Sequence, residues 1–572
     1  MTPQTNEPHH DAAIVHPPEP GDPLWWRTAV TYQIYPRSWA DSDGDGLGDL
    51  PGITSHLDYL RALGVDAIWL SPFYTSAQRD GGYDVADYRN VDPIFGTLAD
   101  FDAMAEKAHG LGLRVVIDVV PNHTSNLHAW FRAALAAQAG SRERARYIFR
   151  DGRGPDGDEP PNNWRSVFGG PAWQRVDDGQ WYLHLFDYHQ PDLNWDNDEV
   201  RAEFLDVLRF WLDRGVDGFR VDVAHGLVKQ AGLPSWQMPP ADLRLEGTLP
   251  TNASPYWDQN GVHEIYPAWR ALLDDYSART PDHPRVMVAE AWVQPLERMA
   301  LYLRPDEFHL GFNFDFLECL WRATDLRAVI DHSLRSNDLV GAPTTWVLSN
   351  HDVVRHASRL GLPQERPRPN GIGPDDPQPD AVLGLRRARA ATTLMLGLPG
   401  AAYLYQGEEL GLPDATDLPA AVRQDPTFRF TEVSEMGRDG CRVPFPWSRE
   451  APSFGFGPSD RSWLPQPTVY GELAEDQQEG VDGSTLELYR TLIRLRAERR
   501  LGAGGLAWLD GFGDEVVAYA NVDGAGRRTV VVTNLGAEPV PLKGDLGEVI
   551  VASGPLLESR TLPADTTVWL AR

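Results

Sequence analysis

Short apolar runs alternate with longer amphipathic segments along most of this chain. Each run is compact enough to be a buried strand, and each following segment carries apolar residues at helical spacing. The runs begin near residues 30, 66, 114, 216, 285, 309, 344 and 400. Eight successive strand–helix units predict an α/β fold, a (β/α)₈ barrel of the TIM type.

Helical periodicity is clear in several of the connecting segments. The strongest case ends at Gly215, and its apolar face consists of Val200, Phe204, Val207, Leu208, Trp211 and Leu212. Other predicted helices span Ile53 to Leu63, Leu98 to Leu111, Ala381 to Leu396 and Ser484 to Arg499. The last of these begins with a capping-box pattern, Ser484 followed by Glu487.

Two regions depart from this alternation. Between residues 124 and 189 the chain is dense in Gly, Pro, Asp and Trp around short strands, which indicates an inserted domain B after the third strand. From residue 501 to 572, β-branched runs follow one another without helices, which predicts a C-terminal antiparallel β domain, domain C. The barrel, domain A, takes residues 25–123 and 190–500, and residues 1–24 form a polar, proline-rich tail predicted to be disordered.

The composition is ordinary for a water-soluble chain of more than one domain. Its 572 residues are 42% hydrophobic and 23% charged. The formal net charge of −30 argues against binding nucleic acid or an anionic membrane surface and suits a neutral substrate, although solubility alone accounts for it. No apolar run is as long as the ~18 residues of a transmembrane helix, and the N-terminus lacks an apolar signal core, so we expect a cytoplasmic protein.

A loop after the first strand has the pattern of a cation site. Asp residues alternate with other residues between positions 41 and 49, and interleaved glycines permit a tight turn. The spacing begins like an EF-hand, but Gly52 occupies the twelfth position, where that motif requires Glu. We therefore expect one structural Ca²⁺ outside an EF-hand, with a plain Asp/Gly turn as the alternative. The expected ligands are Asp41, Asp43, Asp45, the backbone carbonyl of Leu47, and Asp49.

The octapeptide G-F-R-V-D-V-A-H, residues 218–225, couples a strand to charged side chains. Arg220 lies two residues before Asp222, so an extended strand places both side chains on one side. A carboxylate beside a guanidinium stays ionised at neutral pH, because the positive charge favours the charged form. Such a carboxylate suits the nucleophile of covalent glycosyl transfer, and a buried structural ion pair is the alternative for this segment alone.

Further acidic and imidazole side chains follow the ends of other predicted strands. In a (β/α)₈ barrel the carboxyl ends of all strands meet at one rim, which forms the active site. Carboxylates far apart in sequence but gathered at one rim are hard to explain as structure alone. The residues that predict this site are Asp118, His123, Asp222, Glu290, His351 and Asp352. Glu408 and Glu409 also follow a strand, and we expect them to lie behind the reacting groups.

Seven segments of the chain together form a specific set of motifs within residues 25 to 500. They are D-V-V-P-N-H (118–123), Q-P-D-L-N (190–194), G-F-R-V-D-V-A-H (218–225), E-A-W (290–292), N-H-D (350–352), G-V-D-A-I-W-L-S-P (64–72) and G-R-D-G-C-R-V-P-F-P-W (437–447). This set resembles glycoside hydrolase family 13, the α-amylase superfamily, and within it the α-glucosidase and oligo-1,6-glucosidase type. The resemblance implies that family's barrel with its inserted domain B and its C-terminal domain C.

The resemblance also implies a role for each residue at the rim. Asp222 would be the nucleophile, and Asp352 a third carboxylate that binds sugar hydroxyls. Glu290 would be the general acid and then base, protonated at rest because of the neighbouring carboxylates. Anomeric configuration would be retained if the carboxyl groups of Asp222 and Glu290 lie about 5–5.5 Å apart. Asp84 and Arg442 would grip the non-reducing-end glucose and make the attack exo. The remaining substrate-binding residues implied are Tyr83, His123, Gln190, Arg220 and His351.

The implied function is hydrolysis of terminal α-linked glucose from short oligosaccharides by an exo-acting, retaining α-glucosidase. Val223 is typical of members that cleave α-1,6 bonds, but Ala224-His225-Gly226 departs from their pattern, so we expect α-1,4 substrates such as maltose to be favoured. An oligo-1,6-glucosidase, a transglucosylase or a trehalose-forming enzyme shares the chemistry up to the covalent intermediate. A non-catalytic barrel relative would lose carboxylates and carry a membrane span, which this sequence does not suggest. Chain-length preference and oligomeric state stay open.

Overall fold

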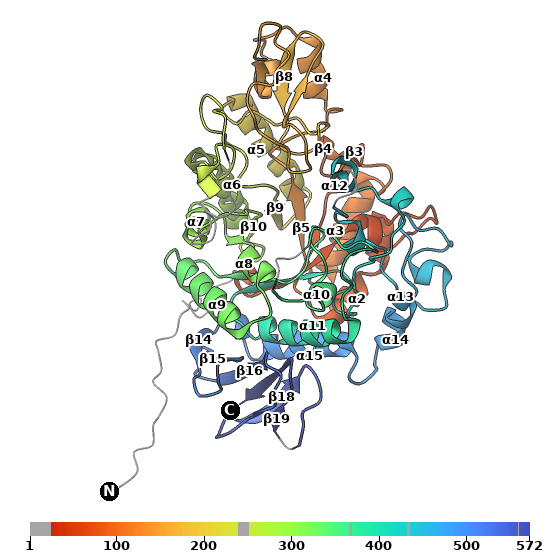
Figure 1. Cartoon of the computed structure of the whole chain (residues 1–572), viewed down its shortest axis with the longest axis vertical. Coiled ribbons are helices and arrows are strands. Elements are labelled where there is room, and N and C mark those ends of the chain that lie inside the picture. The colour runs from red at the N-terminus through yellow and green to blue at the C-terminus, as the bar shows by residue number, and fades with distance from the viewer. Residues whose placement is uncertain (1–23, 238–250, 366–368, 432–434, 559, 572) are drawn as a thin grey trace.

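The computed structural model describes residues 24–237, 251–365, 369–431, 435–558 and 560–571. Three parts follow one another along the long axis in Figure 1, with domain B at one end, the barrel in the middle and domain C at the other end. The predicted disordered tail, residues 1–24, lies outside the described residues except for Leu24. Within the described part of the chain, none of the helices combines the length and the hydropathy of a membrane span.

Eight parallel strands form the barrel that the alternating pattern predicts. They pair in the order β11-β10-β9-β5-β2-β1-β13-β12, and a parallel bridge from Phe312 to Thr345 joins the two ends of this order. The closed sheet confirms the (β/α)₈ prediction. The strands are β1 (Val30–Ile34), β2 (Ala67–Leu70), β5 (Arg114–Val119), β9 (Gly218–Val221), β10 (Val286–Ala289), β11 (Leu310–Gly311), β12 (Thr345–Val347) and β13 (Ala401–Tyr405).

Burial on both faces explains why the barrel strands read as continuous apolar runs. All positions of β1 and β13 are buried, for example, and so are those of β9 and β10. The register of these strands also positions the rim. Asp118 of β5 lies beside Arg220 of β9, and Ala289 of β10 lies beside Val221 of β9. The residues that directly follow β9 and β10 therefore emerge side by side.

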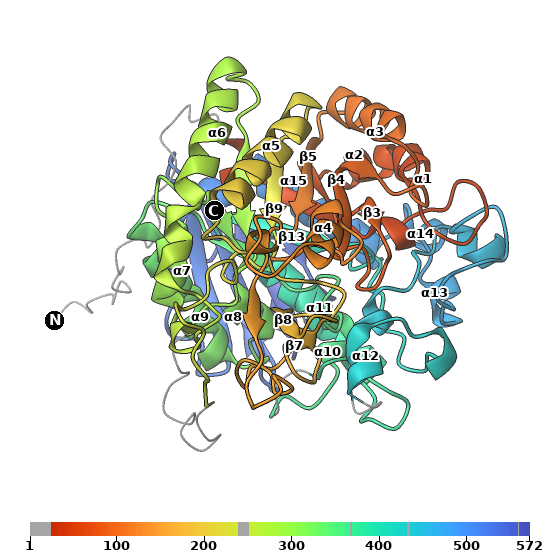
Figure 2. The ribbon, with the colours of Figure 1, turned by 90° about the horizontal axis from the view of Figure 1, so that it is seen from above.

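Helices surround the barrel, as Figure 2 shows from above. The predicted apolar face before Gly215 is confirmed, because all six of its residues are buried in α5 (Asp198–Asp213). The helix predicted for Ile53 to Leu63 is wrong in detail. It is two helices, α1 (Leu50–Ser55) and α2 (Leu57–Leu63), because His56 between them has non-helical angles, φ −106° and ψ 10°.

The remaining helices follow the barrel strands or cover their connections. Those of the barrel are α3 (Leu98–Gly110), α6 (Tyr266–Arg279), α7 (Leu296–Tyr302), α8 (Phe314–Glu318), α9 (Ala323–Asp338), α10 (His356–Arg359), α11 (Ala381–Leu396), α12 (Pro426–Phe430), α13 (Val469–Glu472), α14 (Glu475–Gln478) and α15 (Thr485–Glu498). Ser484 caps α15 by accepting a hydrogen bond from the N–H of Glu487, as predicted. The reciprocal half of the capping box is replaced, because the Glu487 carboxylate accepts from the N–H of Gly480 at 3.0 Å.

Domain B has its own small core above the barrel. It contains α4 (Ala129–Ala136) and an antiparallel sheet in the order β6-β8-β7, with β6 (Phe149–Asp151), β7 (Trp173–Arg175) and β8 (Gln180–Leu183). Trp164, Trp173 and Leu183 pack together in its core. An antiparallel pair, β3 (Tyr74–Ser76) and β4 (Val85–Val91), precedes it in the chain and lies beside it in Figure 1.

Domain C is the antiparallel β domain that the C-terminal β-branched runs predict. Its five strands pair in the order β14-β15-β16-β20-β18, and β17 pairs with β19. One face packs on α11, where Tyr519 and Trp569 donate hydrogen bonds to the backbone carbonyls of Leu394 and Thr393. The strands are β14 (Gly505–Trp508), β15 (Val516–Val522), β16 (Arg528–Asn534), β17 (Val540–Pro541), β18 (Glu548–Ala552), β19 (Thr561–Leu562) and β20 (Thr566–Ala571).

Two consecutive carboxylates, Glu408 and Glu409, are buried just after β13. Tyr32 and Tyr59 both donate hydrogen bonds to Glu409, at 2.6 and 2.7 Å. Tyr489 of α15 lies 3.4 Å from Glu408. These partners lie between the barrel and its surrounding helices, so the pair supports the packing of the barrel wall. Burial raises the pKa of Glu408 to about 8.

This raised pKa makes stability depend on pH. The folded state favours the protonated form of Glu408. The contribution of Glu408 to the free energy of unfolding is therefore full below the ordinary pKa of 4.5, and it is lost as the pH rises through about 8. We expect Glu408→Gln to reduce the fall of the unfolding temperature between about pH 5 and 9, with a gain of roughly 1–3 °C at the alkaline end. Thermal unfolding across this range tests it. Glu498→Gln, an exposed change on α15, is the control, and parallel curves for wild type and Glu408→Gln would contradict the prediction.

Candidate active site

The strand register gathers four charged side chains at the carboxyl rim of the barrel. Asp118 and Arg220 are paired neighbours in β5 and β9, and Asp222 and Glu290 come directly after β9 and β10. The backbone N–H groups of Asp222 and Glu290 continue the sheet hydrogen bonds, at 2.9 and 3.0 Å. All four residues are buried. The barrel therefore brings together acids that are far apart in sequence, as predicted.

One guanidinium lies among three carboxylates. Arg220 contacts Asp222 at 2.6 Å and Asp118 at 3.0 Å through Nη1, and its Nη2 lies 3.7 Å from Oε2 of Glu290. The Arg220 side chain is 2% exposed, and its guanidinium lies over the ring of Trp69 at 5.2 Å. Asp222 and Glu290 thus flank a single, fully enclosed cation.

A single positive charge does not neutralise three buried acids, so the cluster holds protons. Burial raises the pKa of Asp118 to about 7, although Arg220 opposes the shift. Burial also raises the pKa of Asp222; the nearby Glu290 and Asp118 add to the shift and Arg220 again opposes it. This differs from the expectation that Arg220 keeps Asp222 ionised, because Arg220 is shared. Protons in such a cluster belong to the group rather than to one residue.

Glu290 is held by two N–H donors. The backbone N–H of Val223 donates to Oε2 at 2.6 Å, and the indole N–H of Trp292 donates to Oε1 at 2.8 Å. Val223 has φ +46°, a left-handed conformation that costs a β-branched residue about 1–2 kcal/mol. The Trp292 ring stacks on Phe314 with centroids 3.8 Å apart. The strained backbone at Val223 and the stacked ring of Trp292 thus direct two N–H donors at the carboxylate of Glu290.

Asp352 lies in a different electrostatic environment. Its Oδ1 contacts Arg442 at 2.9 Å and Arg438 at 3.0 Å, and its Oδ2 lies 3.2 Å from Nε2 of His351. Burial raises the pKa of Asp352, but His351, Arg438 and Arg442 outweigh burial and hold this pKa well below its ordinary value. Asp352 is therefore permanently ionised, in contrast to the proton-holding acids around Arg220.

A chain of hydrogen bonds connects the two groups of acids. Gln33 donates to Nδ1 of His351 at 2.6 Å, which leaves the His351 proton on Nε2. Nε2 lies 2.6 Å from the hydroxyl of Tyr83, and this hydroxyl donates to Asp118 at 2.9 Å. Tyr83 and His351, both predicted from sequence, thus lie between Asp352 and the acids around Arg220.

Two more of the predicted substrate-binding residues meet at a neighbouring point. Gln190 donates to Nε2 of His123 and to Oδ2 of Asp80, both at 3.1 Å. Burial lowers the pKa of His123 to about 4, so this imidazole is neutral at pH 7 and accepts the bond. Gln190 and His123 therefore present a fixed, uncharged polar surface beside Asp80.

Asp84 and Arg442, the two residues expected to grip the terminal glucose, make different contacts in the structure. Asp84 accepts hydrogen bonds from the hydroxyl of Ser76 at 2.8 Å and from the N–H of Arg79 at 2.9 Å, and these bonds shape its own loop. Arg442 instead contacts Asp352 and donates to the carbonyl of His351 at 2.8 Å. Arg442 lies at the rim, and Asp84 is buried in the loop after β3, where none of the described residues donates to its Oδ2.

Arg438 forms ion pairs that the sequence analysis did not predict. Arg438 contacts Asp80 at 2.6 Å, Asp352 at 3.0 Å and Asp425 at 2.5 Å. The sequence contained the signal, because R-D-G-G-Y-D and G-R-D-G-C-R each offer two candidates of the same charge. Spacing alone did not say which acid pairs with which arginine.

The expected cation loop is partly assembled. Carboxylate oxygens of Asp41, Asp43 and Asp49 lie within 4.8 Å of one another. Three carboxylates at this spacing are the oxygen donors that a hard cation such as Ca²⁺ prefers. The Asp45 carboxylate is not part of this group. The residues present fit a cation, and Asp41 and Asp49 are buried.

A family model described as the α-amylase catalytic domain matches residues 33–504. The chain belongs to the α-amylase family. A probable α-glucosidase from Rhizobium meliloti (strain 1021) is 39% identical over 502 residues, 85% of each chain. An oligo-1,6-glucosidase from Heyndrickxia coagulans is 35% identical over 510 residues, 82% of this chain and 85% of that one. The crystal structure of the α-glucosyl transfer enzyme XgtA has a TM-score of 0.82 at 38% identity, over 96% of this chain and 99% of that one.

These findings confirm the resemblance to the α-glucosidase type of glycoside hydrolase family 13, and this α-amylase-family chain is a glycoside hydrolase. The motif segments quoted from the sequence all lie inside the matched range. Membership of the family does not by itself assign a role to each residue. In this chain, the contacts around Arg220 and Arg438 are the observations on which the role of each residue can be argued.

The ion pairs of Arg438 predict a large effect of its removal. Arg438→Met leaves three carboxylates, on Asp80, Asp352 and Asp425, without their shared cation, and breaking a buried ion pair costs about 3–5 kcal/mol. We expect a clear fall of the unfolding temperature. Arg429→Met, an exposed change in α12, is the matched control and leaves that temperature unchanged. Equal unfolding temperatures for Arg438→Met and wild type would contradict this account of the rim.

Proposed function

We propose that this chain is an exo-acting α-glucosidase that releases terminal, non-reducing α-linked glucose from short oligosaccharides with retention of configuration. The observation that carries the proposal is the enclosed Arg220, which has Asp222 on one side and Glu290 on the other. Two carboxyl groups that share one cation at a barrel rim suit a double displacement.

In this mechanism Asp222 attacks the anomeric carbon of glucose. When the proton of the acid cluster resides on Glu290, Asp222 is an ionised nucleophile held by Arg220. Glu290 gives its proton to the departing glycosidic oxygen, so the bond breaks as the covalent glucosyl–Asp222 ester forms. Glu290 then takes a proton from water, which attacks the ester and releases glucose with its original configuration.

The permanently ionised Asp352 suits a different role. A fixed negative charge beside the sugar favours the positive charge that develops on the glucose ring in an oxocarbenium-like transition state. Hydrogen bonds from glucose hydroxyls to Asp352 would also orient the ring. Arg438 and Arg442 hold Asp352 in place, so this carboxylate needs no reorganisation during the reaction.

The Asp80–Arg438 ion pair supports exo attack. Asp80 lies in the segment after β3, and Arg438 lies in the segment after β13. They contact each other at 2.6 Å, next to Asp352. A closed barrier at this point would leave room for one terminal glucose and none for a chain that continues beyond it. Short oligosaccharides, rather than internal bonds of a long polymer, are therefore the proposed substrates.

The alternative functions differ in the glycosidic linkage that is cleaved and in the molecule that accepts the glucosyl group. The departure of Ala224-His225-Gly226 from the α-1,6 pattern supports α-1,4 substrates such as maltose, whereas Val223 and the Heyndrickxia coagulans relative favour an oligo-1,6-glucosidase. The similarity to XgtA supports a transglucosylase, in which a sugar replaces water as acceptor. All three share the glucosyl–Asp222 intermediate.

A substrate panel tests the proposed function. We expect glucose release from maltose to exceed release from isomaltose, sucrose, trehalose and starch, and Asp222→Asn to lower turnover by roughly a thousandfold or more without changing the unfolding temperature. Asp206→Asn, an exposed change in α5, serves as the control. Faster release from isomaltose would move the assignment to the oligo-1,6 type, and survival of activity in Asp222→Asn would exclude it as nucleophile.

We also propose that the Asp41–Asp49 loop binds a structural Ca²⁺. Bound cation would bridge carboxylates that otherwise repel one another, so its removal destabilises the fold more than it slows turnover. We expect chelation to lower the unfolding temperature of wild type and added Ca²⁺ to restore it. Asp41→Asn should be insensitive to both. A wild-type unfolding temperature that ignores chelator and Ca²⁺ alike would mean that the loop is a plain turn.

A further inference from the structure

The backbone of Glu290 is fixed to the segment that carries Asp222. The N–H of Glu290 donates to the carbonyl of Val221 at 3.0 Å, and its carbonyl accepts from the N–H of Ala224 at 2.9 Å. These two bonds continue the pairing of β9 with β10 beyond the ends of both strands. The sheet therefore places the start of the Glu290 side chain, whereas the direction of its carboxylate depends on side-chain contacts.

The two oxygens of the Glu290 carboxylate have different neighbours. Oε2 accepts from the backbone N–H of Val223 at 2.6 Å and lies 3.7 Å from Nη2 of Arg220. Oε1 accepts from the indole N–H of Trp292 at 2.8 Å. A proton on Oε2 would face the full positive charge of Arg220, whereas the indole beside Oε1 is neutral. An oxygen that carries a proton keeps a lone pair, so a protonated Oε1 still accepts from Trp292. The proton of this acid is therefore more stable on Oε1.

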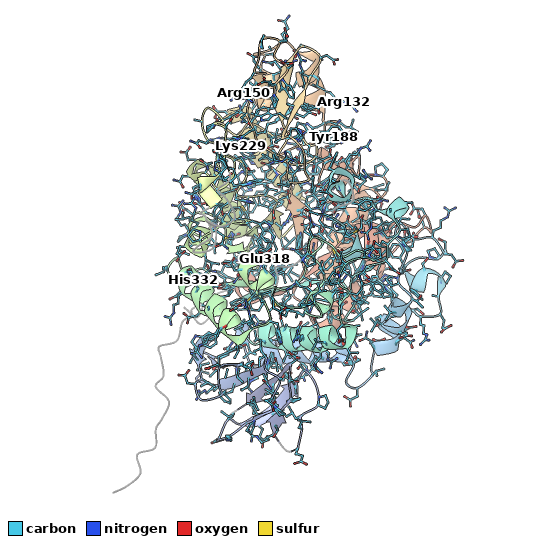
Figure 3. The ribbon with its side chains drawn as sticks, viewed as in Figure 1. Arg132, Arg150, Tyr188, Lys229, Glu318 and His332 are labelled. Atoms are coloured by element: carbon cyan, nitrogen blue, oxygen red, sulfur yellow. The ribbon has the colours of Figure 1, made fainter. Side chains whose placement is uncertain are left out.

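The Trp292 ring is held by a stacked neighbour and also borders a cavity. It stacks on Phe314 with centroids 3.8 Å apart and an interplanar angle of 2°. Phe314 begins α8, which the Asn313 side chain caps by accepting from the N–H of Phe316 at 3.0 Å. Both rings line a cavity of about 130 Å³, and Figure 3 labels Glu318, another of its lining residues, at the end of α8. Packing does not enclose the indole on every side, so the stack and the bond to Oε1 set its direction.

We propose that Oε1 of Glu290 transfers the proton in both steps of the reaction, and that Trp292 is the positioning residue that directs this oxygen. The inference deepens the proposed function and rests on it, because it takes Glu290 as the general acid and base. When the proton passes to the glycosidic oxygen, the bonding electrons of Oε1–H stay on Glu290, and the indole N–H stabilises the charge that forms there. In the second step the same oxygen takes a proton from water, again beside the indole.

This role separates proton transfer from nucleophilic attack. Asp222 is held by Arg220 at 2.6 Å, whereas the indole of Trp292 donates to Glu290. Loss of the indole N–H therefore acts on the protonation of the leaving group. Substrates differ in their need for this proton, since the alkoxide of a sugar is a strong base that departs only when it is protonated, whereas fluoride is a weak base that departs without an acid. A substrate whose leaving group is fluoride should therefore be insensitive to Trp292.

The test compares two substrates in Trp292→Phe, which keeps a ring on Phe314 and removes the N–H. We expect kcat/KM for maltose to fall about ten- to a hundredfold, because the proton donor is no longer directed. For α-glucosyl fluoride, kcat/KM reports the first step alone and should stay within about threefold of wild type. Phe314→Leu removes the stack and keeps the N–H, so it should show the same selective loss to a smaller extent.

Trp508→Phe is the matched control, because the indole N–H of Trp508 in domain C donates to the carboxylate of Asp331 at 2.9 Å. This variant should keep the wild-type kcat/KM for both substrates. In Trp292→Phe, an equal loss for the two substrates, a rise of KM for maltose with unchanged kcat, or wild-type kinetics would each refute the positioning role and leave the proposed function standing. If Glu290→Gln hydrolyses maltose as fast as wild type, Glu290 is not the acid and the proposed function itself fails.

Discussion

The structure depends on one buried guanidinium that faces too many carboxylates. Arg220 lies under a closed rim with Asp118, Asp222 and Glu290 around it, and a single positive charge leaves this group short of neutrality. Burial therefore raises the pKa of Asp118 and of Asp222, so the group holds protons. The same group then contains an anion that can attack and an acid that can donate, which are the two requirements of a double displacement.

A second cluster of opposite character surrounds Asp352. Here His351, Arg438 and Arg442 all contact the Asp352 carboxylate and together outweigh its burial, so Asp352 stays ionised. Arg438 also reaches Asp80 and Asp425. Hydrogen bonds and ion pairs thus join the reacting acids to the barrier beside them.

Local patterns were sufficient for the fold and for the principal acids. Strands buried on both faces read as apolar runs, and the barrel rule then places Asp222 and Glu290 at one rim. Pairings between distant loops were not accessible in this way. The pairing of Arg438 with Asp80 rather than with Asp84, four residues away in the same loop, depends on where β3 and β4 turn. The burial of Glu408 against tyrosines likewise depends on helices that are distant in sequence.

The central claim is that Asp222 becomes covalently attached to glucose. Incubation with a fluorinated glucosyl fluoride that accumulates the intermediate, followed by mass spectrometry of peptic fragments, measures this directly. The account predicts one added glucosyl group, on the fragment that contains Asp222, and its loss when maltose is supplied as acceptor. A label on Asp118 or Glu290, or release of glucose with inverted configuration and no label, would contradict it.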